Sequence, residues 1–528
     1  MKYLKFLFCF FIFFSCQNDN SLKKENPFIF SIEEFDIEKN QMKINIEITN
    51  TSNKTLNEGK WSLHWNQMHS GIIPESLPNG ISFKYINGQA YYILTFDQNY
   101  SIKPNEKIKF SFLQKGILKR KPYGPLGAFI RNHETDELFN LPLTFNWRNA
   151  KNLDKINHDS PKDKYDSMSG LSVLPNNQLN WVIPTPKKLK FHNKYRDIPK
   201  EFIVNYTNEI NIDTKVISMR LKNSTSIEIE FNNKKEGNTI LKYDNNYDKE
   251  EYSLKIKEDL IEIKASDYSG ILYAFESLHQ LILISENENN KLPIISIEDS
   301  PRFKYRGFLL DASRNFYGIN KVKQVIDYMA HFKLNKLDFR LTDDEGWRLE
   351  IPGLPELTEI GSKRGFTKDE SDKLIPMYGS GAFSDNSGSG YYTREEFVEI
   401  LKYAKRRNID VFPQISFPSH ARAAIKSMEV RHKNYMLKND EISANKYLLN
   451  DLKDESKYRS AQQYDDNIIC ICQESAYTFF EKIVKEVKKM YDEANLEMKI
   501  FNIGADEVPF GAWQKSPICE KFISKNKK

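Results

Sequence analysis

A pair of adjacent carboxylates, Asp506 and Glu507, is the feature of this sequence best suited to acid–base chemistry. A carboxyl group placed at a reacting bond can give up a proton and take one back. Neighbouring side chains on a regular strand point to opposite faces of the sheet. The two groups can therefore serve one site only if the strand has ended or bulged there. A solvated turn is the plainer interpretation of such a pair.

Three other polar residues stand just after apolar stretches of the chain, namely Arg314, Asp343 and His420. The carboxyl ends of successive parallel strands meet at one mouth, so we expect these side chains to converge with the carboxylate pair. Each has a simpler interpretation: Arg314 could pair with Asp311 alone, His420 could be a structural hydrogen-bonding residue, and Asp343 with Asp344 could hold a metal ion. We expect no metal, because His420 is the one obvious nitrogen ligand in the pattern.

Alternating strands and helices must position these residues. From residue 301 the chain repeats an apolar run followed by a stretch with helical periodicity, which predicts a parallel sheet or barrel. The predicted strands are 307–311, 336–342, 410–415 and 498–503. A long segment rich in Gly and Ser, 361–390, interrupts the second unit as a loop, at the end where active-site loops of such folds lie.

The preceding chain predicts two more domains, so the fold class is multidomain. Residues 28–150 alternate apolar and polar positions in short runs, which is typical of a β-sandwich. Residues 151–176 are polar and predict a linker. Residues 177–300 combine strands with one amphipathic helix near 271–282 and predict a small α+β domain. The last domain, 301–528, holds the strand–helix repeats.

The first sixteen residues predict an export signal. Lys2 and Lys5 precede the apolar run 6–14, which is too short to span a bilayer. The run ends at Ser15 and Cys16, and a small residue before a cysteine at that point resembles a bacterial lipobox. We expect Cys16 to carry a lipid that anchors the exported protein to a membrane of the cell envelope. An ordinary secretory signal with an incidental cysteine is the alternative.

The composition limits the remaining possibilities. The 528 residues are too many for a single core. Hydrophobic residues make up 40% and aromatic residues 13%, which excludes a disordered chain. A formal net charge of +5 over this length gives no basis for nucleic-acid binding. The five cysteines do not predict a disulfide framework, and the spacing of Cys470 and Cys472 is not that of a zinc site.

Taken together, four segments resemble the barrel motifs of glycoside hydrolase family 20, the β-N-acetylhexosaminidases and chitobiases. They are RGFLLDASRNF at 306–316, LTDDEGWRLEIPGLPELTEIGSKRG at 341–365, VFPQISFPSHA at 411–421 and FNIGADEV at 501–508. The two preceding domains resemble that family's chitobiase-type sandwich and the α+β domain before its barrel. The resemblance implies a (β/α)8 barrel that hydrolyses terminal β-linked GlcNAc or GalNAc from glycans or chito-oligosaccharides, by substrate-assisted catalysis with retention and without a cofactor.

The resemblance also implies a role for each site residue. Glu507 matches the general acid/base, and Asp506 matches the carboxylate that orients and stabilises the acetamido group of the substrate. Arg314 matches the arginine that binds sugar hydroxyls. Asp343 and His420 match a polar pair that supports the acid.

The sequence departs from the family pattern in two ways. Polar residues near the site differ from the usual ones, among them Asp338, Ser419, Asn502 and Ala505. Only four strands of the repeat are predicted before Lys528. We therefore expect the first half of a barrel, with little or no hydrolase activity in the chain by itself. A fragment of a longer or split enzyme, a non-catalytic glycan-binding lipoprotein, and a remnant without function are the alternatives.

Overall fold

The computed structural model describes residues 28–38, 41–68, 71–86, 90–116, 125–145, 161–170, 181–207, 211–287 and 290–526. The predicted signal segment, including Cys16, lies outside the described residues. The chain divides into two units, 1–158 and 159–528, and each is described by itself. Among the described residues, no helix has both the length and the apolar character needed to cross a membrane.

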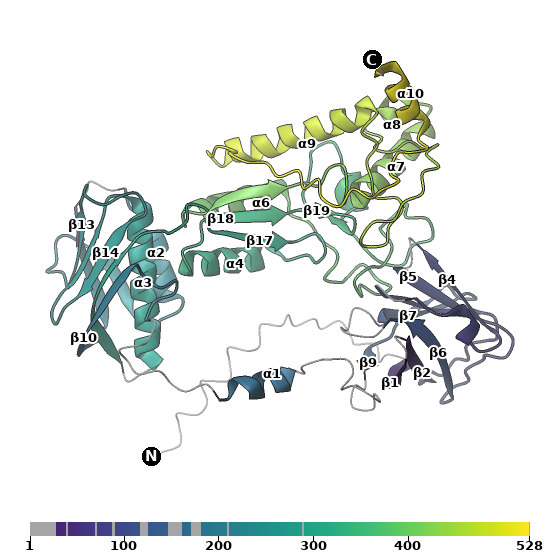
Figure 1. The fold of residues 1–528 in the computed structure, drawn as a ribbon, viewed down its shortest axis with the longest axis horizontal. Helices are drawn as coiled ribbons and strands as arrows, with labels where there is room; N and C mark the ends of the chain where they lie inside the picture. The colour runs from purple at the N-terminus through teal and green to yellow at the C-terminus, as the bar shows by residue number, and fades with distance from the viewer. Residues whose placement is uncertain are drawn as a thin grey trace. The chain divides into compact units, whose positions relative to one another are not determined.

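The first unit contains two sheets that share one core, as in a β-sandwich (Figure 1). The strand orders are β6-β2-β1-β9 and β4-β5-β3-β7-β8. Alternation along β2 buries Met42, Ile44, Ile46 and Ile48, which pack in the same core as Trp65 of the opposite sheet. The elements are β1 (Phe28–Glu38), β2 (Gln41–Asn50), β3 (Trp61–Asn66), η1 (Pro74–Ser76), β4 (Ile81–Ile86), β5 (Tyr91–Phe96), β6 (Lys107–Lys115), β7 (Leu126–Asn132), β8 (Leu138–Asn140) and β9 (Leu143–Phe145).

The second unit begins with a helix, α1 (Pro161–Met168), inside the stretch predicted to be a linker. A seven-stranded sheet follows, in the order β10-β16-β14-β15-β13-β11-β12, and shares a core with α2 and α3. The predicted helix 271–282 lies within α3. The elements are β10 (Lys188–Asp197), β11 (Glu201–Tyr206), α2 (Thr214–Lys222), β12 (Glu228–Phe231), β13 (Thr239–Tyr243), β14 (Tyr252–Ile256), β15 (Ile261–Ala265), α3 (Tyr268–Asn287) and β16 (Lys291–Asp299).

The rest of the second unit is built on three parallel strands in the order β17-β18-β21, at the positions predicted from the sequence. Buried Leu337 and Phe339 of β18 share a core with helices α4, α6 and α9. Thr393 caps α6 through the predicted capping box with Glu396. The elements are β17 (Gly307–Asp311), α4 (Ile319–His331), β18 (Lys336–Arg340), β19 (Thr342–Asp343), β20 (Gly346–Trp347), α5 (Glu356–Glu359), α6 (Arg394–Lys405), β21 (Asp410–Gln414), α7 (Arg422–Met436), α8 (Glu441–Asn445), α9 (Glu474–Glu493) and α10 (Pro517–Asn526).

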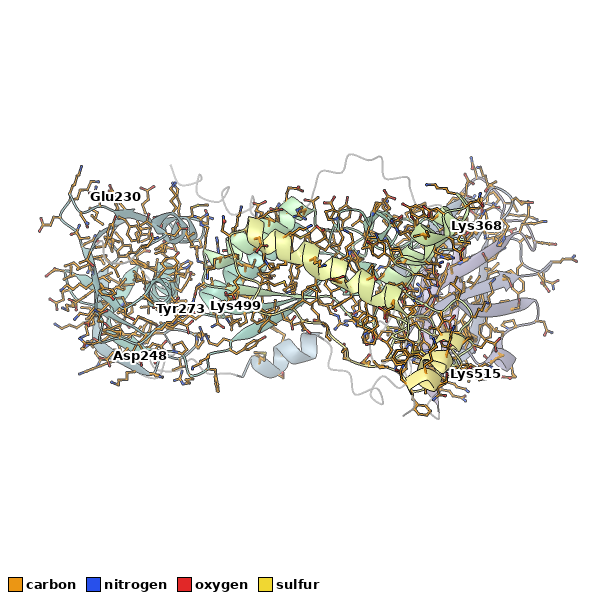
Figure 2. The ribbon with its side chains drawn as sticks, turned by 90° about the horizontal axis from the view of Figure 1, so that it is seen from above. Glu230, Asp248, Tyr273, Lys368, Lys499 and Lys515 are labelled. Carbon is orange, nitrogen blue, oxygen red and sulfur yellow. A yellow bond between two sulfur atoms is a disulfide. The ribbon has the colours of Figure 1, made fainter. Side chains whose placement is uncertain are left out.

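Polar contacts join the seven-stranded sheet domain to this parallel sheet. Arg220 of α2 bonds both Glu276 of α3 and Asp327 of α4. Tyr273 of α3, labelled in Figure 2, accepts hydrogen bonds from Arg306 at 2.7 Å and from Asn408 at 3.0 Å. These contacts hold the amino-terminal end of the parallel sheet, the end opposite to the predicted site.

The prediction of a regular fourth strand at residues 498–503 was wrong. The segment makes a single isolated bridge, between Asn502 and Gln414 of β21. Asn502 N donates to Pro413 O at 3.0 Å, and Ile415 N donates to Asn502 O at 3.0 Å, so the chain does run beside β21. Gly504 and Ala505 then adopt the left-handed conformation, with φ 65° and 64°, which ends the pairing.

The cysteines also differ from expectation, because the structure contains a disulfide between Cys472 and Cys519. The bond links the chain just before α9 to the first turn of α10, and the two Cα atoms lie 5.1 Å apart. Spacing along the sequence could not show this pairing, because it depends on how α10 folds back. Cys470 is free and buried, with its sulfur 3.8 Å from that of Cys519.

Removing this disulfide is expected to destabilise the second unit. It closes a loop with a sequence separation of 47 residues, and a crosslink of that length contributes about 2–4 kcal/mol, mainly by restricting the unfolded chain. We expect Cys472→Ser with Cys519→Ser to lose about this much free energy of unfolding in urea, while Cys470→Ser keeps the bond. Finding three alkylatable thiols between residues 470 and 519 in the unreduced protein would contradict the assignment.

Candidate active site

The polar residues that follow the parallel strands meet at the carboxyl ends of those strands. Arg314 NH2 lies 2.9 Å from Asp343 Oδ2. His420 Nδ1 lies 3.1 Å from Asp343 Oδ1, and His420 Nε2 lies 3.3 Å from Glu507 Oε2. Side chains from four separate segments therefore form one continuous contact chain, from Arg314 through Asp343 and His420 to Glu507.

The carboxylate pair lies where the backbone has left strand geometry. Ala505 and Glu507 have φ values of 64° and 54°, which breaks the alternation of a regular strand. Both carboxylates consequently reach the same imidazole: His420 Nε2 is 3.7 Å from Asp506 Oδ2 and 3.3 Å from Glu507 Oε2. Their side chains are 50% and 46% exposed, so they remain open to a ligand. The strand has therefore ended at the carboxylate pair, which is the condition under which both carboxylates can serve one site.

His420 is a buried cation between the two pairs of carboxylates. Its Nδ1 faces Asp343 Oδ1 at 3.1 Å and Asp344 Oδ2 at 3.4 Å. Burial alone would lower the pKa of His420, but hydrogen bonds to Asp343 and Asp344 and their negative charges raise it to about 10. At neutral pH an imidazolium N–H therefore points toward Asp506 and Glu507.

The protonation of His420 can be measured directly. Its pKa is raised from 6.5 to about 10. The stabilisation from its charge is therefore fully present below pH 6.5 and is lost as the pH rises through about 10. We expect the imidazole NMR signal that His420→Gln removes to report an imidazolium at pH 8. We also expect this substitution to destabilise the protein less above about pH 10 than at pH 6. A midpoint near the ordinary value of 6.5 would show that the two aspartates do not hold the proton.

Arg314 and Arg340 supply the other positive charges of the site. Arg314 NH1 bonds Asp311 Oδ2 at 2.7 Å, so the simple pairing with Asp311 does occur, in addition to the contact with Asp343. Arg340 Nε bonds Asp343 Oδ2 at 2.6 Å, and its NH1 lies 3.9 Å from Asp506 Oδ2. Asp506 thus lies between Arg340 and His420.

Glu345 is a buried acid at the site that the sequence analysis did not single out. Its side chain is fully buried, and its Oε2 lies 3.5 Å from Arg314 Nε. Burial first, and then repulsion from Asp343 and Asp344, raise its pKa to about 8, against the attraction of Arg314. The only sequence signal was a third carboxylate directly after the Asp343–Asp344 pair.

Arg348 was also missed, and it organises the loops around the site. Its guanidinium donates five hydrogen bonds of 2.6–3.0 Å, all to backbone carbonyl groups. The acceptors are Ala312, Ser313, Ser362, Gly388 and Gly390. Arg348 therefore ties both ends of the Gly-rich loop to the segment that carries Arg314. Burial, with repulsion from Arg364, lowers its pKa to about 9.

A second arginine, Arg422, fixes the remaining loops. Its NH1 bonds Glu370 of the Gly-rich loop at 2.8 Å, and its Nε bonds Asp466 at 2.7 Å. Next to Asp466, Asn467 donates to Asp344 Oδ2 at 2.9 Å. The loop between α8 and α9 is thereby fixed against the buried carboxylates of the site.

Residues that depart from the usual family pattern form pairs of their own. Asn502 Nδ2 donates to Asp338 Oδ2 at 3.1 Å. Ser419 Oγ donates to the backbone carbonyl of Asp506. The first contact links the segment 498–503 to β18, and the second holds the backbone at the carboxylate pair.

Family models match most of the second unit. The model described as "Glycosyl hydrolase family 20, catalytic domain" matches residues 303–528, and "Glycosyl hydrolase family 20, domain 2" matches residues 180–300. Similar proteins include a β-hexosaminidase from Vibrio vulnificus, 32% identical over 91% of this chain and 58% of that protein. An N,N'-diacetylchitobiase from Vibrio harveyi is 47% identical over 48% of this chain and 29% of that protein.

A solved structure is also similar. It is a crystal structure of a GH20 exo β-N-acetylglucosaminidase from Vibrio harveyi in complex with N-acetylglucosamine. It superposes with a TM-score of 0.73 at 27% identity and covers 94% of this chain and 71% of that one. The chain spans 58% of the length of the Vibrio vulnificus relative and 29% of the Vibrio harveyi chitobiase.

Proposed function

Because the chain belongs to glycosyl hydrolase family 20, we propose that it carries the catalytic pair of a β-N-acetylhexosaminidase. Such an enzyme removes terminal β-linked GlcNAc or GalNAc from glycans or chito-oligosaccharides. The single observation that carries the proposal is the contact chain from Arg314 through Asp343 and His420 to Glu507. It brings a guanidinium, a buried imidazolium and a half-exposed carboxyl group to one mouth, which supports these roles.

In the proposed mechanism the substrate supplies its own nucleophile. The oxygen of the 2-acetamido group attacks the anomeric carbon while Glu507 protonates the leaving oxygen, and the glycosidic bond breaks. The positive charge that develops on the acetamido nitrogen is stabilised by Asp506. Glu507 then removes a proton from water, which opens the cyclic intermediate with net retention. Most glycoside hydrolases use one carboxyl group as acid and a second as nucleophile or base. Family 20 is an exception, because the substrate supplies the nucleophile.

The geometry of the pair favours this route over attack by Asp506. A protein nucleophile and its acid partner must flank the scissile bond, with carboxyl groups about 5–5.5 Å apart. Asp506 and Glu507 are adjacent in sequence and approach the same nitrogen of His420. Two groups gathered on one imidazole are poorly placed to lie on opposite sides of a sugar ring.

We also propose the domain division expected from the sequence, with residues 301–528 as the first half of a (β/α)8 barrel. Support comes from apolar side chains exposed along the two outer edges of the parallel sheet. On β17 these are Phe308 and Leu309, at 44% and 50% exposure, and in the segment beside β21 they are Ile500 and Ile503, at 47% and 43%. Edges of this kind normally pair with further strands, and closure of a barrel removes them.

Hydrolysis of a chromogenic β-N-acetylglucosaminide tests both proposals. We expect little turnover from the purified 528-residue chain and full turnover from a protein that completes the barrel. A chain that by itself turns over within tenfold of the enzyme median, about 10 per second, would contradict the half-barrel proposal. An inactive complete protein that still binds the sugar would instead favour a glycan-binding function.

The proposed location is the cell envelope, with Cys16 carrying a lipid anchor. Support comes from the apolar run that ends at Cys16 and from the Cys472–Cys519 disulfide, since such bonds persist in oxidising compartments outside the cytoplasm. Cells fed a labelled fatty acid should label the wild-type protein and Cys9→Ser, but not Cys16→Ala. Equal labelling of all three would contradict the anchor.

A further inference from the structure

Glu345 is the buried group of the site to which the proposed mechanism gives no part. It lies in the turn between β19 and β20 with no exposed side-chain surface. Neither of its carboxyl oxygens has a hydrogen-bond partner among the described residues. A side chain so enclosed cannot touch a sugar, so it can act only through a neighbour. Arg314 is that neighbour, at 3.5 Å from Nε to Oε2.

Three carboxylates determine which N–H groups of the Arg314 guanidinium remain available to a sugar. NH1 bonds Asp311 at 2.7 Å, NH2 contacts Asp343 at 2.9 Å, and Nε faces Glu345 at 3.5 Å. A guanidinium has five N–H groups in a fixed plane. With three directed at carboxylates, one N–H remains on each terminal nitrogen. Because the side chain is 25% exposed, this pair can bond two neighbouring sugar hydroxyls.

The three carboxylates differ in the hydrogen bonds that they accept. Asp311 accepts hydrogen bonds from the backbone N–H groups of Ser313 and Arg314, at 3.0 and 3.1 Å. Asp343 accepts from Arg340 Nε at 2.6 Å and from its neighbour's backbone N–H at 2.8 Å. For Asp311, the charge of Arg314 and these hydrogen bonds outweigh burial and hold its pKa below the usual value. Glu345 accepts no hydrogen bond from the described residues. No donor therefore fixes it in the ionised form, and its charge can change with pH.

We propose that Glu345 is a positioning residue for Arg314. While Glu345 is neutral, the guanidinium presents its two outer N–H groups to the sugar. When Glu345 is ionised, it draws Nε inward and weakens sugar binding. This inference rests on the proposed function in one respect, because it takes Arg314 as the group that binds sugar hydroxyls.

The groups around Glu345 bring its ionisation into a pH range in which it can be measured. The charged and titratable groups that face it are Arg314, Asp343, Asp344, Arg348, Arg364, Tyr378 and Tyr464. Burial, and then repulsion from Asp343 and Asp344, outweigh the attraction of Arg314 and Arg364 and raise the pKa of Glu345 to about 8. The carboxyl is therefore neutral at pH 7 and ionised at pH 9.

NMR of the full chain tests the link between the two residues without requiring activity. The probes are carboxyl-¹³C glutamate and ¹⁵N arginine, and the Arg314 Nε signal is the one missing from Arg314→Lys. We expect a carboxyl signal with a midpoint near pH 8 that disappears in Glu345→Gln and remains in Glu359→Gln, which changes an exposed glutamate of α5. The Arg314 Nε signal should move with the same midpoint, except in Glu345→Gln. A carboxyl midpoint near 4.5, or an Arg314 signal that does not move, would overturn the proposal.

Binding of N-acetylglucosamine to a protein that completes the barrel gives the second readout. If only the neutral form of Glu345 is competent, the apparent Kd equals the intrinsic Kd divided by the competent fraction, so affinity should fall about tenfold between pH 7 and pH 9. The fall should occur in wild type and Glu359→Gln and be absent from Glu345→Gln. An equal fall in Glu345→Gln overturns the proposal. If no variant binds the sugar at either pH, the proposed function loses its support, and the Arg314 signal still decides the role of Glu345.

Discussion

Replacing Glu507 with Gln is expected to lower kcat/KM, which reports the step in which the leaving group departs, by about 10²–10⁴-fold for an alkyl N-acetyl-β-glucosaminide in a protein that completes the barrel. The amide keeps the size of the side chain but can no longer deliver a proton to the leaving oxygen. The loss should shrink for a dinitrophenyl leaving group, which departs without protonation. Steady-state kinetics on the two substrates measure both effects.

The matched control is Glu455→Gln, which alters an exposed glutamate on the loop that also carries Gln462, a hydrogen-bond partner of Glu507. It should leave kcat/KM at the wild-type level for both substrates. An equal loss on both substrates in Glu507→Gln would mean that the residue does not act as the acid. A loss in Glu455→Gln would mean that the loop, and not the carboxyl group, is responsible.

Replacing Arg348 with Met is expected to cost about 4 kcal/mol or more of the free energy of unfolding. Ser362 O keeps a hydrogen bond from Gly390 N, but the other four carbonyl groups lose the donors that Arg348 supplies, and each unsatisfied buried polar group costs about 1–3 kcal/mol before relaxation. Unfolding in urea measures the change. The Gly-rich loop should also become more sensitive to proteolysis between residues 361 and 390, because it loses the Arg348 hydrogen bonds near both of its ends.

Arg406→Met is the control for the loss of an arginine as such. Arg406 is 46% exposed and pairs with Asp213 on the surface, and exposed pairs contribute about 0–1 kcal/mol. If Arg348→Met is no more destabilising than Arg406→Met, then water or nearby N–H groups satisfy the carbonyls. The hydrogen bonds of Arg348 would in that case not organise the loops around the site.

The elements that local pattern determines could be predicted from the sequence. The strand 307–311 and the capping box of Thr393 with Glu396 follow from apolar runs and residue types that lie close together in the chain. The convergence of Arg314, Asp343 and His420 followed from the common direction of parallel strands.

The features that the sequence could not supply depend on backbone conformation and on distant pairing. Residues 498–503 have a strand-like composition but make one bridge, at Asn502, and the left-handed backbone at Gly504 and Ala505 ends the pairing directly after it. Arg348 bonds only carbonyl groups, which every residue has, so no residue pattern marks its partners. The Cys472–Cys519 bond likewise requires knowledge of where α10 folds.

Substrate assistance by the 2-acetamido group is the central claim, and one comparison tests it most directly. The measurement is kcat/KM of the completed enzyme for a nitrophenyl β-GlcNAc and for the matching β-glucoside, which differ only at C2. If the acetamido oxygen is the nucleophile, the glucoside should be almost inert, because a positioned reacting group lowers the barrier by about 7–11 kcal/mol. Comparable kcat/KM values for the two sugars, or a covalent sugar trapped on Asp506, would contradict the account.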